Sequence, residues 1–286
     1  MASLVPELAV EESLGGVPEV QSDPALRRRP RVRFWRGIVL FLAGVYFLVP
    51  IYAGLKFSFE NDNNQLSLYA IRAIPSQTGF SAAFFLSVRL AVVATVLVMA
   101  LMVPTATYVH LRLPRMRRVL DFITILPIVI PPIVLILGVL HAAPGWLKAS
   151  PYLLALVYVI LALPFVYRSL DAGLSAIDLK TLVEVSRSLG GRSVSTLWHV
   201  IIPNLRSAML SAVVLTIALV LGEYTMASLD LWTTLPVWIY QFQQSDAHIS
   251  TAVCMLSLIG TWLLLTLIVS VDRSQSRRAR TRTGRL

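Results

Sequence analysis

The sequence predicts an all-α integral membrane protein with six transmembrane helices. Of its 286 residues, 56% are hydrophobic and only 14% are charged, a balance that a soluble chain of this length does not have. The apolar residues are gathered into runs close to the roughly 20 residues that a helix needs to cross a bilayer. The predicted spans are residues 37–55, 83–103, 119–140, 152–170, 207–228 and 250–271.

The basic residues are divided unevenly between the two sides that six spans define. Both termini then lie on one side, which holds 21 Lys and Arg residues against three on the other. Because basic residues are enriched in cytoplasmic segments, both termini are predicted to be cytoplasmic. This distribution assigns the net charge of +10 to topology and to contact with anionic lipid, and it argues against nucleic-acid binding.

The spans are predicted to form one membrane domain, residues 37–271, between two cytoplasmic tails. Residues 1–36 begin acidic and proline-containing and end basic, and this composition predicts disorder. Residues 272–286 form a basic tail. Two outer loops stand out: residues 56–80, which are long enough for a small cap, and residues 229–249, whose aromatic residues suit a membrane interface or a partner domain.

A polar loop at residues 171–206 separates two very apolar spans and predicts a helix, a glycine break and a second helix. Asp178 is a suitable N-cap for the first helix, and Gly190-Gly191 is suited to its end. Ser193 is expected to cap the second helix and Pro203 to limit it. The first helix has a polar face with Lys180, Glu184, Arg187 and Ser188 and an opposite, mostly apolar face with Leu179, Leu182, Ser186 and Leu189.

The spacing within this loop resembles the cytoplasmic "EAA" loop of the permease subunits of ABC importers, the binding-protein-dependent permeases. That pattern is Glu-Ala-Ala, three residues, Gly, nine residues, then Ile-x-Leu-Pro. Both gaps have the same length here, although Val and Ser replace the two Ala residues and Val and Ile replace the Ile and Leu. The matching residues are Glu184, Val185, Ser186, Gly190, Val200, Ile202 and Pro203.

The resemblance implies a type I ABC importer permease fold in which the Glu184–Gly190 helix is a coupling helix, docked in a cleft of an ATPase. It also implies the partners: a second, homologous permease subunit, two cytoplasmic ATPase subunits and an extracytoplasmic solute-binding protein in a bacterial cell membrane. The sequence has no G-x-x-x-x-G-K-[ST] loop, so ATP and Mg²⁺ are expected on the ATPase subunits and no cofactor is expected on this chain.

Within this family, the stretch Gly222-Glu223-Tyr224-Thr225 and the loop Trp232–Tyr240 are most similar to the polyamine (spermidine/putrescine) branch. That branch also has relatives for ferric iron, phosphonates and other small solutes. The resemblance therefore implies a small solute, with a polyamine as the first expectation. Specificity is expected to lie mostly in the binding protein.

Glu223 is the one carboxylate well inside a predicted span, and it shares a helix face with Thr216. An acid at that position is costly in a membrane and suggests a role in the pathway, such as attracting a cationic solute. Arg89, in the second span, lies at a similar predicted depth. Three interpretations stay open: an Arg89–Glu223 ion pair, a cargo or gate role for Glu223, and an Arg89 side chain that reaches the outer surface.

The remaining polar residues suggest no catalytic and no metal site. Asp121 is expected to pair with Arg117 or Arg118, and Asp230 is expected to be a solvated loop acid. The four histidines lie in different loops without metal spacing, as ordinary interfacial residues. Two rival functions remain: a channel or proton-coupled carrier with Glu223 as the titrating site, and a membrane scaffold that recruits partners through the basic C-terminal tail.

Overall fold

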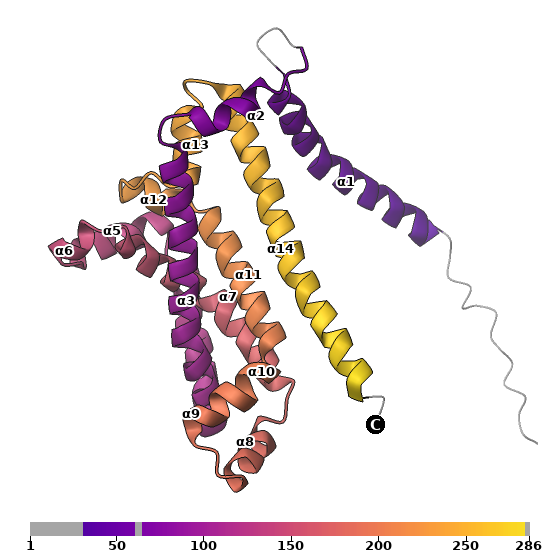
Figure 1. The fold of residues 1–286 in the computed structure, drawn as a ribbon, viewed down its shortest axis with the longest axis vertical. Helices are drawn as coiled ribbons and strands as arrows, with labels where there is room; N and C mark the ends of the chain where they lie inside the picture. Colours follow the sequence, from indigo (N-terminus) through magenta and orange to yellow (C-terminus); the bar gives the residue numbers. More distant parts are fainter. Residues whose placement is uncertain (1–30, 61–64, 284–286) are drawn as a thin grey trace, which may run out of the picture. The chain divides into compact units, whose positions relative to one another are not determined.

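The computed structural model describes the backbone of residues 31–60 and 65–283 and the side chains of residues 35–60, 65–267 and 270. The predicted disorder of residues 1–30 lies outside this range. The described chain is helical apart from its connecting loops and one isolated bridge between Glu60 and Leu66 (Figure 1). The chain divides into two units at Pro50, inside α1, and the helix packing and the sites described below belong to the second unit.

By length and composition, four unbroken helices could cross a membrane, and the number rises to six if each of two bent helix pairs is one span. The unbroken helices are α1 (Arg31–Ser58), α3 (Phe80–Arg112), α7 (Tyr152–Ser175) and α14 (Ala247–Thr283). One bent pair consists of Pro114–Val129, which includes α4 (Arg117–Val129), and α5 (Pro132–Ala142), at 100°. The other consists of Ser193–Asn204 and α11 (Arg206–Leu221), at 78°.

The remaining helices are short and lie between the long ones. They are α2 (Tyr69–Ala73), α6 (Gly145–Lys148), α8 (Leu179–Ser188), α9 (Ser193–Thr196), a π-helical turn at Leu197–Ile201, α10 (Ile202–Asn204), α12 (Thr225–Leu229) and α13 (Leu235–Phe242). Two 3₁₀ turns cover Ile74–Ser76 and Pro114–Met116. Helix α1 starts before residue 37, α7 continues to Ser175 and α14 extends through residues 272–283, so the predicted domain boundaries differ from the helix ends.

Two predicted spans are wrong as single helices. The span 119–140 is broken at Ile130, which is extended (φ −80°, ψ 123°) because the following Pro131 disfavours a helical residue before it. The span 207–228 ends early: α11 stops at Leu221, and α12 begins only at Thr225. Pro50, Pro104, Pro127 and Pro164 lie inside helices, as expected for a membrane bundle.

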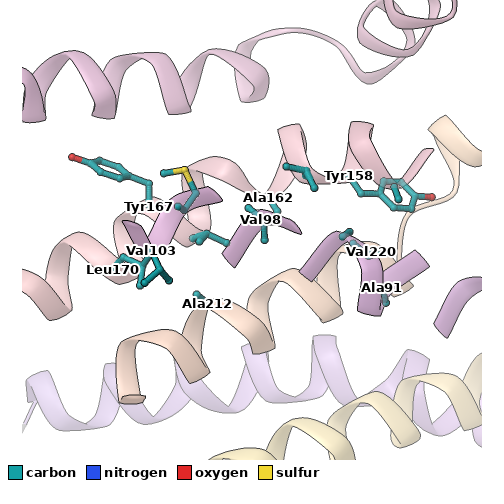
Figure 2. Close-up of a cluster of buried hydrophobic side chains, with 14 of the residues drawn as sticks. Ala91, Val98, Val103, Tyr158, Ala162, Tyr167, Leu170, Ala212 and Val220 are labelled. Atoms are coloured by element: carbon teal, nitrogen blue, oxygen red, sulfur yellow. The ribbon is translucent and has the colours of Figure 1, made fainter. Parts of the chain in front are cut away.

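The core of the bundle lies where α3, α7 and α11 pack together. Small residues at this junction, including Ala94, Ala162 and Ala212, are fully buried and allow the helices to approach closely. Figure 2 shows larger side chains such as Val98 and Leu170 filling the space around them. A hydrogen bond from Ser169 Oγ to the Ala208 carbonyl oxygen (2.8 Å) adds a polar link between α7 and α11.

A smaller apolar cluster joins the segments 69–80 and 235–242 to the start of α14. Trp238 in α13 is buried, stacks on Phe242 and donates a hydrogen bond from Nε1 to the Thr78 carbonyl oxygen (3.0 Å). The described residues 69–80 and 235–249 therefore form one cap, in which Trp238 is an internal packing residue. The hairpin of α8 and α9 lies at the opposite end of α3 from this cap (Figure 1).

Candidate functional site

Helix α8 begins as the sequence predicts. Asp178 accepts hydrogen bonds from the Thr181 backbone N–H at Oδ1 (3.3 Å) and from Thr181 Oγ1 at Oδ2 (2.7 Å). These bonds hold the pKa of Asp178 below its ordinary value, so the cap is ionised at neutral pH. The negative charge also suits the positive end of the helix dipole.

Gly190 ends α8 in a left-handed conformation, with φ +82°. Gly191 N–H donates to the Ser186 carbonyl oxygen (2.8 Å) and Gly190 N–H donates to the Arg187 carbonyl oxygen (2.9 Å), the two bonds of a Schellman motif. A Cβ atom on Gly191 would overlap Ser186 Oγ and lie 2.7 Å from the Ser186 carbonyl oxygen. Both glycines are therefore needed for this turn.

Ser186 joins the two helices of the hairpin. Its hydroxyl lies 2.8 Å from Thr196 Oγ1, and Thr196 Oγ1 donates to the Arg192 carbonyl oxygen (3.0 Å). Ser186 is consequently the donor to Thr196, which is buried. The serine at this position of the "EAA" pattern thus adds a bond that alanine could not make.

The start and end of the second helix differ from the prediction. Ser193 is the first residue of α9, and the preceding Arg192 makes no side-chain cap hydrogen bond. Pro203 lies inside α10, and the chain bends only after it, at Leu205. Ile201 and Leu205, at 2% and 1% exposure, anchor this end of the hairpin in the core, and the sequence reasoning missed both. The pattern residues Val200 and Ile202 are half-buried beside them.

The two faces of α8 have different surroundings. Leu179 and Val183 are buried against the bundle, and the four residues of the predicted polar face are exposed, as expected. Leu189 is 83% exposed, contrary to prediction, because it lies beyond the last turn of α8. In the described part of the chain, no ion pair within 4.0 Å joins Glu184 to Lys180 or Arg187.

The hairpin exposes apolar, acidic and basic side chains, because Lys180, Arg187 and Arg192 are exposed as well as Glu184. We call its exposed apolar side chains together with Glu184 the hairpin surface, which consists of Glu184, Val185, Leu189, Val194 and Trp198. Four of these five side chains are apolar and at least half exposed. An apolar surface of this kind is typical of a site that another protein covers.

Glu223 caps α12 instead of lying within a long helix. Its Oε1 accepts a hydrogen bond from the Met226 N–H (2.8 Å), and its Oε2 accepts bonds from the Ala227 N–H (3.2 Å) and the Tyr158 hydroxyl (3.2 Å). Both carboxylate oxygens are therefore bound by the chain itself. Thr216 is fully buried and donates to the Ala212 carbonyl oxygen (2.8 Å), an internal helix contact. Sequence reasoning missed Tyr158, which lies 65 positions from Glu223.

Arg89 and Glu223 do not form the ion pair that was one of the three interpretations. The Arg89 side chain is exposed, and its guanidinium carbon lies 4.8 Å from the ring centroid of Tyr152, the first residue of α7. This is a cation–π contact, and no ion pair between Arg89 and Glu223 occurs among the described residues. The depth comparison failed because it placed Glu223 within one continuous helix, whereas α11 ends at Leu221.

A double-mutant cycle checks this separation. Arg89→Ala and Glu223→Gln are expected to change the free energy of unfolding independently, with a coupling within about 0.5 kcal/mol, because they share no partner. Thermal unfolding of the two single variants and the double variant in detergent measures the coupling. A coupling free energy of about 1 kcal/mol or more would contradict this separation and support an Arg89–Glu223 ion pair.

Asp230, expected to be a solvated acid, is buried at 9% exposure, and its Oδ2 atom has no hydrogen-bond partner. Burial raises its pKa from 3.8 to about 6. The folded state thus loses stability as the pH rises from about 4 to about 6, and above that range the loss is constant.

Asp230→Asn is expected to unfold at a higher temperature than the wild type, by a margin that grows over this pH range. Thermal unfolding of both proteins at pH 4 and at pH 7 measures this margin, and an equal margin at the two pH values would contradict the burial of an ionisable Asp230.

The comparisons with known proteins place this architecture in a family. Residues 102–281 match the family described as binding-protein-dependent transport system inner membrane component. The match includes both bent pairs and the whole hairpin. The chain resembles the solved structure of a bacterial ABC transporter involved in the import of the acidic polysaccharide alginate, with a TM-score of 0.68 over 87% of this chain and 99% of that one. At 15% identity, this likeness concerns the fold.

Two relatives extend the match over most of the chain. A probable molybdenum ABC transporter permease protein of Haloferax volcanii is 30% identical over 249 residues, 81% of this chain and 89% of the relative. The molybdenum transport system permease protein of Mycobacterium tuberculosis is 29% identical over 216 residues, 69% of this chain and 80% of the relative. Neither supports the polyamine branch that the Gly222–Thr225 stretch suggested. The chain belongs to the family of binding-protein-dependent transport system inner membrane components: it is a multi-pass membrane permease subunit of an ABC importer for a small solute.

Proposed function

We propose that this permease carries a small oxyanion of the molybdate class and is driven by ATPase subunits docked on the hairpin surface. The observation that carries the docking proposal is the exposed Glu184, which makes no ion pair among the described residues, on a hairpin that also exposes four apolar side chains. A carboxylate beside apolar residues suits a protein cleft with a cationic group at its edge. The fixed turn at Gly190 gives α8 one defined orientation for such docking.

The proposal includes the rest of the machine. The hairpin and both termini lie on the cytoplasmic side of a cell membrane, in keeping with the excess of basic residues on that side. A second, homologous permease subunit completes the pathway, two ATPase subunits hold ATP and Mg²⁺, and an extracytoplasmic binding protein delivers the solute. Closure of the ATPase pair moves α8, and the bundle then opens alternately to the two sides.

The oxyanion proposal rests on the two molybdenum permeases and on the state of Glu223. A polyamine pathway would need acidic groups open to the cation. Both oxygens of Glu223 instead accept hydrogen bonds from the chain, so this carboxylate has a structural role as the cap of α12. The similarity to the molybdenum permease of Haloferax volcanii covers 81% of this chain, α12 included.

Transport by the purified complex in proteoliposomes tests both parts of the proposal. With the binding protein outside and ATP inside, uptake of molybdate and no uptake of spermidine are expected. Spermidine uptake would contradict the oxyanion assignment. Molybdate uptake that survives ATP depletion but stops when the proton gradient collapses would favour the proton-coupled carrier, and the absence of any solute flux would favour a scaffold.

A further inference from the structure

Arg117, the first residue of α4, is held by α7 at three points. Its Nε and Nη2 atoms donate hydrogen bonds to Asp171 Oδ1 (3.2 and 2.8 Å), and Nη2 also donates to Ser175 Oγ (2.9 Å). The Tyr167 hydroxyl donates to the Arg117 backbone carbonyl oxygen (3.2 Å). The predicted pairing of Arg117 with Asp121 is therefore wrong: Arg117 pairs with an acid 54 positions away on another helix.

His110, in the last turn of α3, reaches the same carboxylate. Its Nδ1 atom lies 3.0 Å from the Ala106 carbonyl oxygen, and its Nε2 atom lies 3.2 Å from Asp171 Oδ1, without the geometry of a hydrogen bond. Since a carbonyl oxygen can only accept, Nδ1 carries a proton, and a protonated ring would add a second cation beside Asp171. His110 is thus a buried contact between helices and not the interfacial residue that was expected.

The cluster lies directly between the hairpin and the broken span. Asp171 and Ser175 are in the last two turns of α7, and α8 begins at Leu179 after only three connecting residues. Leu179 of α8 and Leu174 of α7 are buried in the same apolar core, so a displacement of α8 acts on this end of α7. At its other end α4 leads to the 100° bend and to α5, which packs against α12.

We infer that the ion pair between Arg117 and Asp171 is the joint through which movement of the hairpin reaches the broken span α4–α5. Arg117 acts as a positioning residue: its planar guanidinium contacts two residues of α7 at once, so α4 follows the end of α7 as a rigid extension. The Arg117 and Asp171 side chains are 38% and 31% exposed, so the pair is partly hydrated and the bundle can fold without it. This inference rests on the proposed docking of an ATPase at the hairpin.

The test compares Arg117→Gln with Arg118→Gln in the complete complex. Arg118 is the matched control, because it is the adjacent arginine, its side chain is exposed, and it makes no ion pair among the described residues. In Arg117→Gln, the amount of molybdate imported per ATP hydrolysed is expected to fall at least about fivefold, the lower end of common coupling strengths. The ATPase should still copurify with this variant. Arg118→Gln should stay within about twofold of the wild type, which is below that coupling range.

Further variants separate a mechanical role from a loss of folding. Arg117→Lys keeps the charge but loses the two-residue contact, so an intermediate transport-to-hydrolysis ratio is expected. If Arg117→Gln does not insert, Asp171→Asn removes the same pair with an isosteric side chain and is expected to lower the ratio equally. If the inserted variant imports as much molybdate per ATP hydrolysed as the wild type, the role of the Arg117–Asp171 pair as a joint is contradicted. An equal fall of this ratio in Arg118→Gln would contradict it too. Loss of ATPase copurification in Arg117→Gln would also overturn it, by placing the defect in docking.

The two proposals fail in different ways. If Glu184→Lys leaves the ATPase bound and uptake unchanged, the docking proposal fails, whatever the Arg117 variants do. If Glu184→Lys releases the ATPase but Arg117→Gln transports with the wild-type ratio, only the joint fails.

Discussion

Gly190→Pro is expected to leave the permease inserted in the membrane and to abolish ATP-driven uptake. Proline fixes φ near −65°, whereas Gly190 has φ +82°, and proline also removes the N–H that donates to the Arg187 carbonyl oxygen. A mismatch of this kind costs about 3 kcal/mol or more. Because 1.36 kcal/mol corresponds to a factor of ten, the population of the docking-competent hairpin should fall on the order of 100-fold.

A graded series at Gly190 separates this conformational cause from simple loss of a glycine. Asn tolerates the left-handed region better than other residues, so Gly190→Asn should retain most of the uptake. Gly190→Ala, which costs about 1–2 kcal/mol in that region, should be intermediate. Uptake and the ATPase rate are measured side by side in proteoliposomes. Equal uptake by the Asn, Ala and Pro variants would show that the left-handed turn has no part in coupling.

Glu184→Lys is expected to release the ATPase from the complex. Glu184 has no ion-pair partner within the described chain, so its charge is available to a cationic group on the ATPase. Truncating one partner of a buried, hydrogen-bonded charge pair at an interface costs about 2–5 kcal/mol, and reversal of the charge adds repulsion. Copurification of the ATPase with the permease, at fixed ionic strength, measures the effect.

The control for this variant is Lys180→Gln, which alters an exposed charge one turn earlier on α8. It should retain the ATPase, because Lys180 is outside the spacing that resembles the coupling loop. Glu184→Gln should bind with intermediate strength, since the amide keeps one hydrogen-bond acceptor. Normal copurification with Glu184→Lys would remove the basis for the docking role.

The hairpin could be predicted from the sequence because its determinants are local. Asp178 caps the helix within three residues, and the bonds of Gly190 and Gly191 reach back no further than Ser186. The burial of Leu179 follows from the helical period of the sequence. The position of Leu189 was mispredicted only because the helix ends one residue earlier.

The breaks in the third and fifth spans could not be predicted in this way. Apolar residues continue on both sides of Ile130 and of Gly222-Glu223, so both runs have the length of a span. Proline alone is no guide, since Pro104 and Pro164 lie inside unbroken helices. Whether the lost hydrogen bond bends a helix depends on the packing of its neighbours, which a single sequence does not contain.

The polar contacts between helices were missed for a related reason. Tyr158 meets Glu223 and Asp171 meets Arg117 only because α7 packs against α11 and α4 at particular angles. Asp121 was therefore expected to pair with Arg117 or Arg118, and depth along the helices made an Arg89–Glu223 pair one of three interpretations. The first pairing assumed that residues close in sequence are in contact, and the second assumed contact between residues at equal depth. Neither assumption takes account of the packing of α7 against its neighbours.

Cross-linking from the hairpin tests the docking of an ATPase most directly. With Cys254, the one cysteine, replaced by Ser, a Leu189→Cys variant places a thiol on the hairpin surface, and Leu231→Cys places one at a residue of similar exposure in the loop after α12. In the assembled complex, a short thiol–amine reagent should join the Leu189→Cys variant to the ATPase chain and leave the Leu231→Cys variant unjoined. Labelling of the Leu189→Cys variant by an impermeant maleimide added outside intact cells, or the absence of any cross-link to the ATPase, would contradict the account.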